Sequence, residues 1–333
     1  MKSTARKRVL QAINSTASES SWSQLSAGLG AAAWAGVVVL ARAGIAPLGS
    51  IELIFLFAPL VVVPLGMELL RVDGAGRFDR IAQWVQPLCA ALAIIALWLP
   101  PGRPAGILAS GWMCLCSLLA VSPPTSFLSF SRPLAAGRLR LRRLGALARI
   151  DLLVGGAWFL ASRFSMHPFR TQEPMVLLTA VHFHFAGFAT AVICAAMLRF
   201  AHQHGLERWL KRLLPVVVGM PYVVAAGFVI SPALKMGAGV VFSASVAALA
   251  IALRSIAKHT QSASARFFLE IAAVGVFAGM VLSSVYAIAD FRGQYGLAIP
   301  QMAGTHGLLN AVGFCLPGLL GWLIENSGEA QRE

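Results

Sequence analysis

Charged side chains are scarce in this sequence. Asp, Glu, Lys and Arg make up 12% of its 333 residues, whereas a soluble globular domain carries roughly 25%. Hydrophobic residues reach 58%, and the mean hydropathy is +0.75. This balance excludes an ordinary water-soluble domain. Because no stretch shows the alternating pattern of an outer-membrane barrel, we predict an all-α protein, a polytopic transmembrane helical bundle.

Several cofactor and catalytic motifs are also missing. The sequence has no Walker A loop, no Gly-x-Gly-x-x-Gly after a strand and no serine nucleophile elbow, so energy from ATP or a nicotinamide cofactor is not expected. The five cysteines all fall inside apolar runs, at Cys89, Cys114, Cys116, Cys194 and Cys315. We interpret them as packing residues, not as a disulfide framework or a zinc site. We predict no cofactor and no stoichiometric metal.

Apolar windows of about 20 residues predict ten membrane spans. They cover 27–46, 51–70, 82–99, 104–122, 144–162, 174–198, 213–231, 234–253, 267–289 and 301–324. We expect residues 1–24 to form a polar cytoplasmic arm, 25–325 the bundle and 326–333 a cytoplasmic tail. The arm is not read as a cleavable signal peptide, because no apolar core follows its charges closely.

The distribution of Lys and Arg predicts the orientation of the bundle. With ten spans, 21 of these residues fall on the side of the two termini and 6 on the other side. This bias predicts that both termini are cytoplasmic. The net charge of +14 then reflects the same bias and attraction to anionic lipid headgroups, and it requires no nucleic acid.

A few polar side chains interrupt the apolar spans, and the topology puts most of them in the half of the membrane away from the termini. Ionisable and polar groups in a bilayer core are costly, so they usually face a bundle interior or a cavity and have a function. Their convergence predicts one outward-facing cavity. Asp151 and Glu270, by contrast, are expected to be interfacial anchors near the inner ends of their spans. The predicted site residues are Glu52, His182, His184, His306 and Asn310.

Helix geometry separates these candidates. His182 and His184 point about 200° apart on a regular helix, so one is expected to serve the site and the other a neighbouring helix. His306 and Asn310 are one turn apart and share a face. Each candidate also has a structural interpretation: hydrogen bonds across the bundle for the histidines, a polar clamp for His306 with Asn310, and a favourable helix N-terminal charge for Glu52.

Three stretches together resemble the bacterial YndJ-like membrane-protein family. They are residues 51–66, residues 178–187 with the sequence His-Phe-His-Phe-Ala-Gly at their end, and residues 305–314, which read Thr-His-Gly-Leu-Leu-Asn-Ala-Val-Gly-Phe. The resemblance implies a multi-span helical protein of the bacterial inner membrane. It implies no particular reaction.

Three functional hypotheses follow, of different classes. The first is an integral membrane enzyme, a biosynthetic cyclase or isomerase, in which Glu52 or a histidine and a second group perform general acid–base catalysis on a lipophilic substrate such as an epoxide, polyketide, isoprenoid or lipid. The second is a haem or metal protein with a redox or sensing role, in which His182 or His184 pairs with His306. The third is a proton or small-molecule transporter, although no inverted repeat supports it. Expected partners are the lipophilic substrate and membrane lipids.

Overall fold

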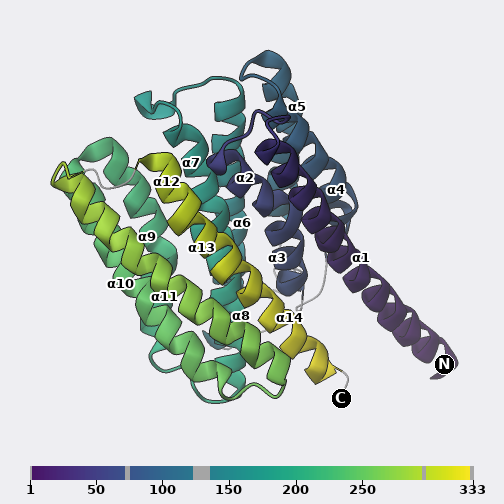
Figure 1. Ribbon diagram of the computed structural model, residues 1–333. Coiled ribbons are helices and arrows are strands. Elements are labelled where there is room, and N and C mark those ends of the chain that lie inside the picture. Colours follow the sequence, from purple (N-terminus) through teal and green to yellow (C-terminus); the bar gives the residue numbers. More distant parts are fainter. Residues whose placement is uncertain (1, 72–75, 123–135, 295–297, 331–333) are drawn as a thin grey trace.

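Ten helical spans, each long and apolar enough to cross a membrane, make up the described part of the computed structural model (Figure 1). The described residues are 2–71, 76–122, 136–294 and 298–330, without the side chains of 2–21, 136–140 and 329–330. Within these ranges every regular element is a helix, and none is a strand. The predicted all-α bundle is confirmed.

All ten predicted spans overlap observed ones. The observed spans are Trp22–Arg42, Ser50–Leu70, Arg77–Trp98, Arg103–Val121, Leu141–Arg163, Met175–Gln203, Leu210–Ile230, Pro232–Ala257, Ala263–Phe291 and Ile299–Gly328. The first and last helices are longer than their spans: α1 covers Lys2–Arg42 and α14 covers Leu316–Ala330. The predicted boundaries after residues 24 and 325 therefore fall inside helices that continue through them.

The second and sixth spans form the centre of the bundle. In their most apolar windows, 83% and 78% of the residues are buried, more than in any other described span. The second span consists of α2 (Ser50–Phe57), η1 (Ala58–Val62) and α3 (Val63–Leu70). The sixth consists of α7 (Met175–His182), η4 (Phe183–Ala189) and α8 (Thr190–Gln203). They pack closely at Gly66, where an added Cβ would lie 2.7 Å from the ring of Phe188.

The remaining spans surround this centre. On one flank lie α1, α4 (Arg77–Trp98) and α5 (Arg103–Val121), and on the other lie α9 (Leu210–Ile230), α10 (Pro232–Ala257) and α11 (Ala263–Phe291) (Figure 1). α6 (Ala136–Arg163) packs between α5 and the sixth span, and the short η3 (Pro168–Arg170) follows it. α9 and α10 form a tight antiparallel pair. The Lys235 backbone packs against Gly227, where an added Cβ would lie 2.6 Å from the Lys235 Cα.

The tenth span alternates between α and π geometry. It runs through α12 (Ile299–Met302), η5 (Ala303–Gly307), α13 (Leu308–Asn310), η6 (Ala311–Cys315) and α14. It packs on α11 with almost no space between the backbones, since a Cβ on Gly275 would lie 2.2 Å from the Gly313 carbonyl oxygen. The Gly275 to Gly279 motif is therefore a helix contact, as its small-xxx-small spacing indicates.

The π segment η1 shows how one helix irregularity is stabilised by a neighbour. The Val63 N–H bonds to the Ala58 carbonyl, five residues back. In this register the next N–H would bond to the Pro59 carbonyl, but residue 64 is a proline and has no N–H. The Gln86 side chain of α4 replaces it, donating from Nε2 to the Pro59 oxygen at 2.6 Å. The same amide accepts a bond from the Ser26 hydroxyl at 2.7 Å.

The start of α1 and the end of α14 lie on one side of the bundle (Figure 1). We call this the basic side, because the α8–α9 and α10–α11 connections lie there and most Lys and Arg residues belong to it. A buried ion pair of 3.0 Å between Arg149 and Asp79 joins α6 to α4 near this side. Glu325 of α14 accepts backbone hydrogen bonds from Gln261 and Ser262, which fixes the start of α11.

Candidate active-site cavity

A cavity of about 460 Å³ lies between α9, α10 and α11 on one side and the second, sixth and tenth spans on the other. Its volume is typical of a small-molecule site. It extends from Met175 and Ile299, at the helix ends opposite the basic side, to Phe314 near the middle of the tenth span. Most of its lining is apolar. Its polar groups include three of the predicted site residues, His182, His306 and Asn310.

His306 is held in one orientation by α11. Its Nδ1 lies 2.8 Å from the Gly279 carbonyl oxygen, and a carbonyl can only accept, so Nδ1 carries the hydrogen. In the neutral ring Nε2 is then an acceptor. Asn310, one turn later, donates from Nδ2 to the His306 carbonyl at 2.9 Å, and the same Nδ2 lies 3.0 Å from the His306 Nδ1 and 3.2 Å from its Nε2. The Asn310 Oδ1 is buried without a hydrogen-bond partner.

Gly279 contributes to this site in two ways that the sequence did not reveal. Its carbonyl orients His306, and its missing side chain leaves room for Asn310, because an added Cβ would lie 2.8 Å from the Asn310 Oδ1. The small-xxx-small spacing predicts close packing there, but it says nothing about which side chains the partner helix presents.

His182 reaches the same cavity from the sixth span. Its Nε2 lies 3.4 Å from the Pro221 carbonyl oxygen of α9, and its ring contacts Phe183 and Phe242 edge to face. With Nε2–H directed at that carbonyl, the remaining nitrogen Nδ1 is an acceptor. The cavity is thus flanked by two neutral imidazoles from two different spans.

His184 lies outside the cavity lining, on the opposite face of the same span, as the predicted divergence requires. It is fully buried. The Trp112 indole donates to its Nε2 at 3.0 Å, and its Nδ1 lies 2.7 Å from the Ala180 carbonyl oxygen. Both nitrogens are therefore occupied, so we leave His184 out of the proposed site and assign it to packing between α5, α6 and η4.

Glu52 is also absent from the cavity lining. Ile51 and Ile54 present their side chains to the cavity, and a residue between them on the helix points elsewhere. The Glu52 Oε2 accepts a bond from the Gly49 N–H at 3.0 Å. A carboxylate in the first turn of α2 is favoured by the helix dipole. The structure therefore supports a capping role, and our proposal gives Glu52 no part in catalysis.

The cavity has a charged mouth that the predicted site residues did not include. Lys235, near the start of α10, forms a 2.6 Å ion pair with Asp290, near the end of α11. The ammonium also lies 5.2 Å from the centre of the Phe228 ring. All three residues line the cavity, together with Tyr286 and Ser283 deeper along α11. An amphipathic molecule would meet charge at the mouth and imidazoles further in.

Asp151 is a buried residue, contrary to its interpretation as an interfacial anchor. It is completely buried near the middle of the fifth span, where Gly187 leaves it space: a Cβ on Gly187 would lie 2.8 Å from the Asp151 Cβ. It accepts a hydrogen bond from the Tyr222 hydroxyl through Oδ1, and its Oδ2 has no partner. The expected neighbour Arg149 pairs with Asp79 instead. Glycines in the facing helix allowed this burial, and single-sequence reasoning could not identify them as neighbours.

Among the described residues, no three His, Cys, Asp or Glu side chains are grouped so that they could hold a metal ion.

The fold and this cavity define a polytopic α-helical membrane protein with a polar site inside the membrane. The family model of the YndJ-like proteins matches residues 53–314, and the chain belongs to this family. One curated relative is "Uncharacterized membrane protein YndJ" of Bacillus subtilis (strain 168), 29% identical over 179 residues. That alignment covers 54% of this chain and 32% of the relative, so the chain matches about a third of the relative's length. No solved structure matches the chain.

Proposed function

We propose that this chain is a membrane-embedded enzyme of the isomerase or cyclase type, which binds a lipophilic small molecule in the cavity and moves a proton on it. One observation carries the proposal: the Gly279 carbonyl fixes the tautomer of His306, and this ring lines a mostly apolar cavity that also holds His182. An imidazole oriented by a backbone carbonyl through one nitrogen is a general base at the other.

The chemistry needs no co-reactant. His306 Nε2 takes a proton from a C–H or O–H of the substrate, and the imidazolium returns this proton at a second position, either directly or by passing it to His182, which then delivers it. Bonds move within the substrate, so protons and electrons balance. The apolar walls exclude water, which strengthens the hydrogen bonds that hold the reacting groups.

Asn310 is suited to orient the substrate. Its Nδ2 is engaged with His306, and its buried Oδ1 has no partner. A buried acceptor left without a bond is unfavourable by about 1–3 kcal/mol. Rotation of the amide that turns Oδ1 away from Gly279 and toward a substrate hydroxyl in the cavity would therefore recover part of this amount in binding. The preferred substrate is therefore an apolar molecule with a hydroxyl or enol near its reacting carbon.

The haem alternative uses the same two histidines, His182 and His306, as ligands. It is distinguished by a visible absorption spectrum of the purified protein, since a bis-histidine haem absorbs strongly and the proposed enzyme does not. A haem spectrum that His306→Ala abolishes would replace the proposal.

The test of the enzyme exploits exchange of the transferred proton with solvent. Membranes that contain wild-type protein are incubated in D2O with a lipophilic extract of the native host, and deuterium in the extracted molecules is measured by mass spectrometry. We expect a molecule that gains deuterium with the wild type and with His259→Ala, which alters an exposed histidine on the basic side, but not with His306→Ala. His306→Ala should remain folded, as judged by its elution and melting temperature. Equal exchange by folded His306→Ala would refute the proposal.

A further inference from the structure

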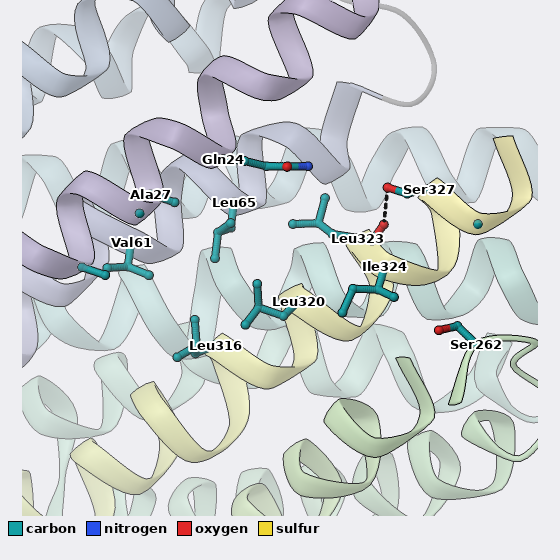
Figure 2. A pocket seen from close by; sticks show the side chains of 13 residues that line it. Gln24, Ala27, Val61, Leu65, Ser262, Leu316, Leu320, Leu323, Ile324 and Ser327 are labelled. Carbon is teal, nitrogen blue, oxygen red and sulfur yellow. Dashed lines mark hydrogen bonds between the residues drawn. The ribbon is translucent and has the colours of Figure 1, made fainter. Parts of the chain in front are cut away.

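A second hollow, separate from the histidine cavity, lies on the lipid-facing surface between α1 and α14. Its volume is about 920 Å³, and it shares no lining residue with the histidine cavity. Val61 and Leu65 of the second span form its floor. Figure 2 shows Leu65 and Leu320 lying between the α1 and α14 ribbons. We call this hollow the α1–α14 groove.

The groove is about one leaflet deep. Along α14 its lining runs from Leu316 to Gly328, which at 1.5 Å per residue is about 18 Å, or a little over half of the roughly 30 Å hydrocarbon core. It ends at mid-span because α1 then closes on the second span. A Cβ on Gly30 would lie 1.9 Å from the Leu60 carbonyl oxygen, and the Trp34 indole donates to the Leu53 carbonyl at 2.7 Å.

The lining changes from apolar to polar along this length. Val61 and Leu316 line the end at mid-span, whereas Gln24, Ser262 and Ser327 line the end at the basic side (Figure 2). A lipid molecule has the same gradient, with acyl chains in the core and a polar head at the surface. A membrane-spanning partner helix fits poorly, because it would need an apolar surface along the whole thickness of the bilayer.

Two cations lie near the polar end in the sequence. Ser262 belongs to the α10–α11 connection, which begins at Lys258, and Arg266 follows in the first turn of α11. Among the described side chains, Glu325 contacts this connection and accepts the backbone N–H groups of Gln261 and Ser262. Lys258 is exposed. Cations next to the membrane surface attract anionic headgroups.

We propose that the α1–α14 groove binds an anionic phospholipid of the leaflet on the basic side, with an acyl chain over Val61 and Leu65 and the phosphate near Ser262 and Lys258. The inference is independent of the catalytic proposal, because the two sites have no residue in common.

Two glycines of α1 allow a matched test. A Cβ on Gly28, in the groove, or on Gly36, outside it, meets nothing within 4 Å. Delipidated protein is titrated with phosphatidylglycerol and bound lipid is counted by native mass spectrometry. We expect one tight site in wild type and Gly36→Leu, and binding weaker by about tenfold, or about 1.4 kcal/mol, in Gly28→Leu, because the leucine fills the groove. Equal melting temperatures for the two variants would show that the fold is retained.

Two results would overturn the proposal. One is unchanged phosphatidylglycerol binding by folded Gly28→Leu. The other is a wild-type dimer that Gly28→Leu converts to a monomer, which would assign the groove to a second copy of the chain. For the headgroup, Lys258→Gln should lower the preference for phosphatidylglycerol over phosphatidylcholine, and an unchanged preference would refute the anionic part of the inference.

Discussion

A histidine acts as a proton acceptor only if one ring nitrogen has a free lone pair, and the two buried imidazoles of this protein differ in that respect. In His184 both nitrogens are engaged, by Trp112 and by the Ala180 carbonyl. In His306 the Gly279 carbonyl engages Nδ1. The Asn310 Nδ2 lies 3.0 Å from Nδ1 and 3.2 Å from Nε2, hence over the ring, and leaves the in-plane lone pair of Nε2 free. The same residue type therefore has a packing role in one span and a proposed chemical role in another.

Gly279→Ala tests whether the missing side chain builds the site. The new methyl group would lie 2.8 Å from the Asn310 Oδ1, so we expect the amide to be displaced and the protein to lose about 1–3 kcal/mol of stability through overpacking. Thermal unfolding in detergent measures the change. The proton exchange attributed to His306 should fall with it.

Gly219→Ala serves as the control for helix propensity. An added Cβ at Gly219 of α9 meets nothing within 4 Å, and alanine favours a helix interior over glycine by about 1 kcal/mol. This variant should be as stable as wild type or more so. If Gly279→Ala behaves in the same way, Asn310 does not depend on the space at Gly279.

Residues that act within one helix could be predicted from the sequence, and those that act across helices could not. His306 and Asn310 share a face because they are one turn apart, and the structure places both in one cavity. Tertiary packing brings Gly279 and Lys235 to the cavity, and a single sequence does not indicate which helices pack together. Glu52 was misleading because depth in the membrane does not specify the direction of a side chain.

At the scale of the element, irregular helix geometry occurs in the spans that carry the site. The four described π segments, η1, η4, η5 and η6, all lie in the second, sixth and tenth spans. Such segments are frequent at functional sites. Pro59 and Pro64 within the second span are typical of a kinked helix. Nothing in the sequence distinguishes a π segment from an ordinary helix around His184 or His306.

Gln86→Leu tests whether the Gln86 side chain stabilises η1. It removes the donor to the Pro59 carbonyl and the acceptor of the Ser26 hydroxyl, so we expect a loss of about 1–3 kcal/mol for each buried group left unpaired. Pro64→Ala supplies a backbone N–H in the register that bonds to Pro59. In the Gln86→Leu background it should therefore restore part of the lost stability.

The double-mutant cycle between Gln86→Leu and Pro64→Ala isolates this effect. Free energies of unfolding of the four proteins in mixed micelles should give a coupling of about 1 kcal/mol. Strictly additive effects would mean that the Gln86 side chain does not replace the missing N–H of Pro64.

At the scale of the whole molecule, the orientation in the membrane remains a prediction. The positive-inside bias of 21 against 6 Lys and Arg residues places the basic side in the cytoplasm. Reporter domains fused after residues 103 and 168 should be active only on the external face, and a fusion after residue 205 only in the cytoplasm. A cytoplasmic signal at either of the first two positions would contradict this orientation.

The number and type of spans followed from hydropathy alone, because a bilayer leaves a hydrophobic chain few alternatives to helices. Which spans lie at the centre did not follow, since all ten are similarly apolar. The second and sixth spans are central because glycines such as Gly66 and Gly187 let bulky groups of neighbouring spans approach. This packing depends on the match between the surfaces of two helices, and a single sequence does not indicate which surfaces match.

The π segments also have a consequence for how this chain tolerates changes in its length. A π turn holds one residue more than an α turn, so deletion of a single codon within Ala303–Gly307 could restore a regular helix without breaking it. The part of the span beyond the deletion would then keep its direction, because the turn still closes with one residue fewer. Asn310 and the rest of the span would keep their neighbours, and the change would be confined to the side chains of the turn itself, which includes His306. Family members whose genes differ by one codon at such a turn can therefore keep the same spans and the same helix packing and differ in the side chains that this turn presents to the cavity.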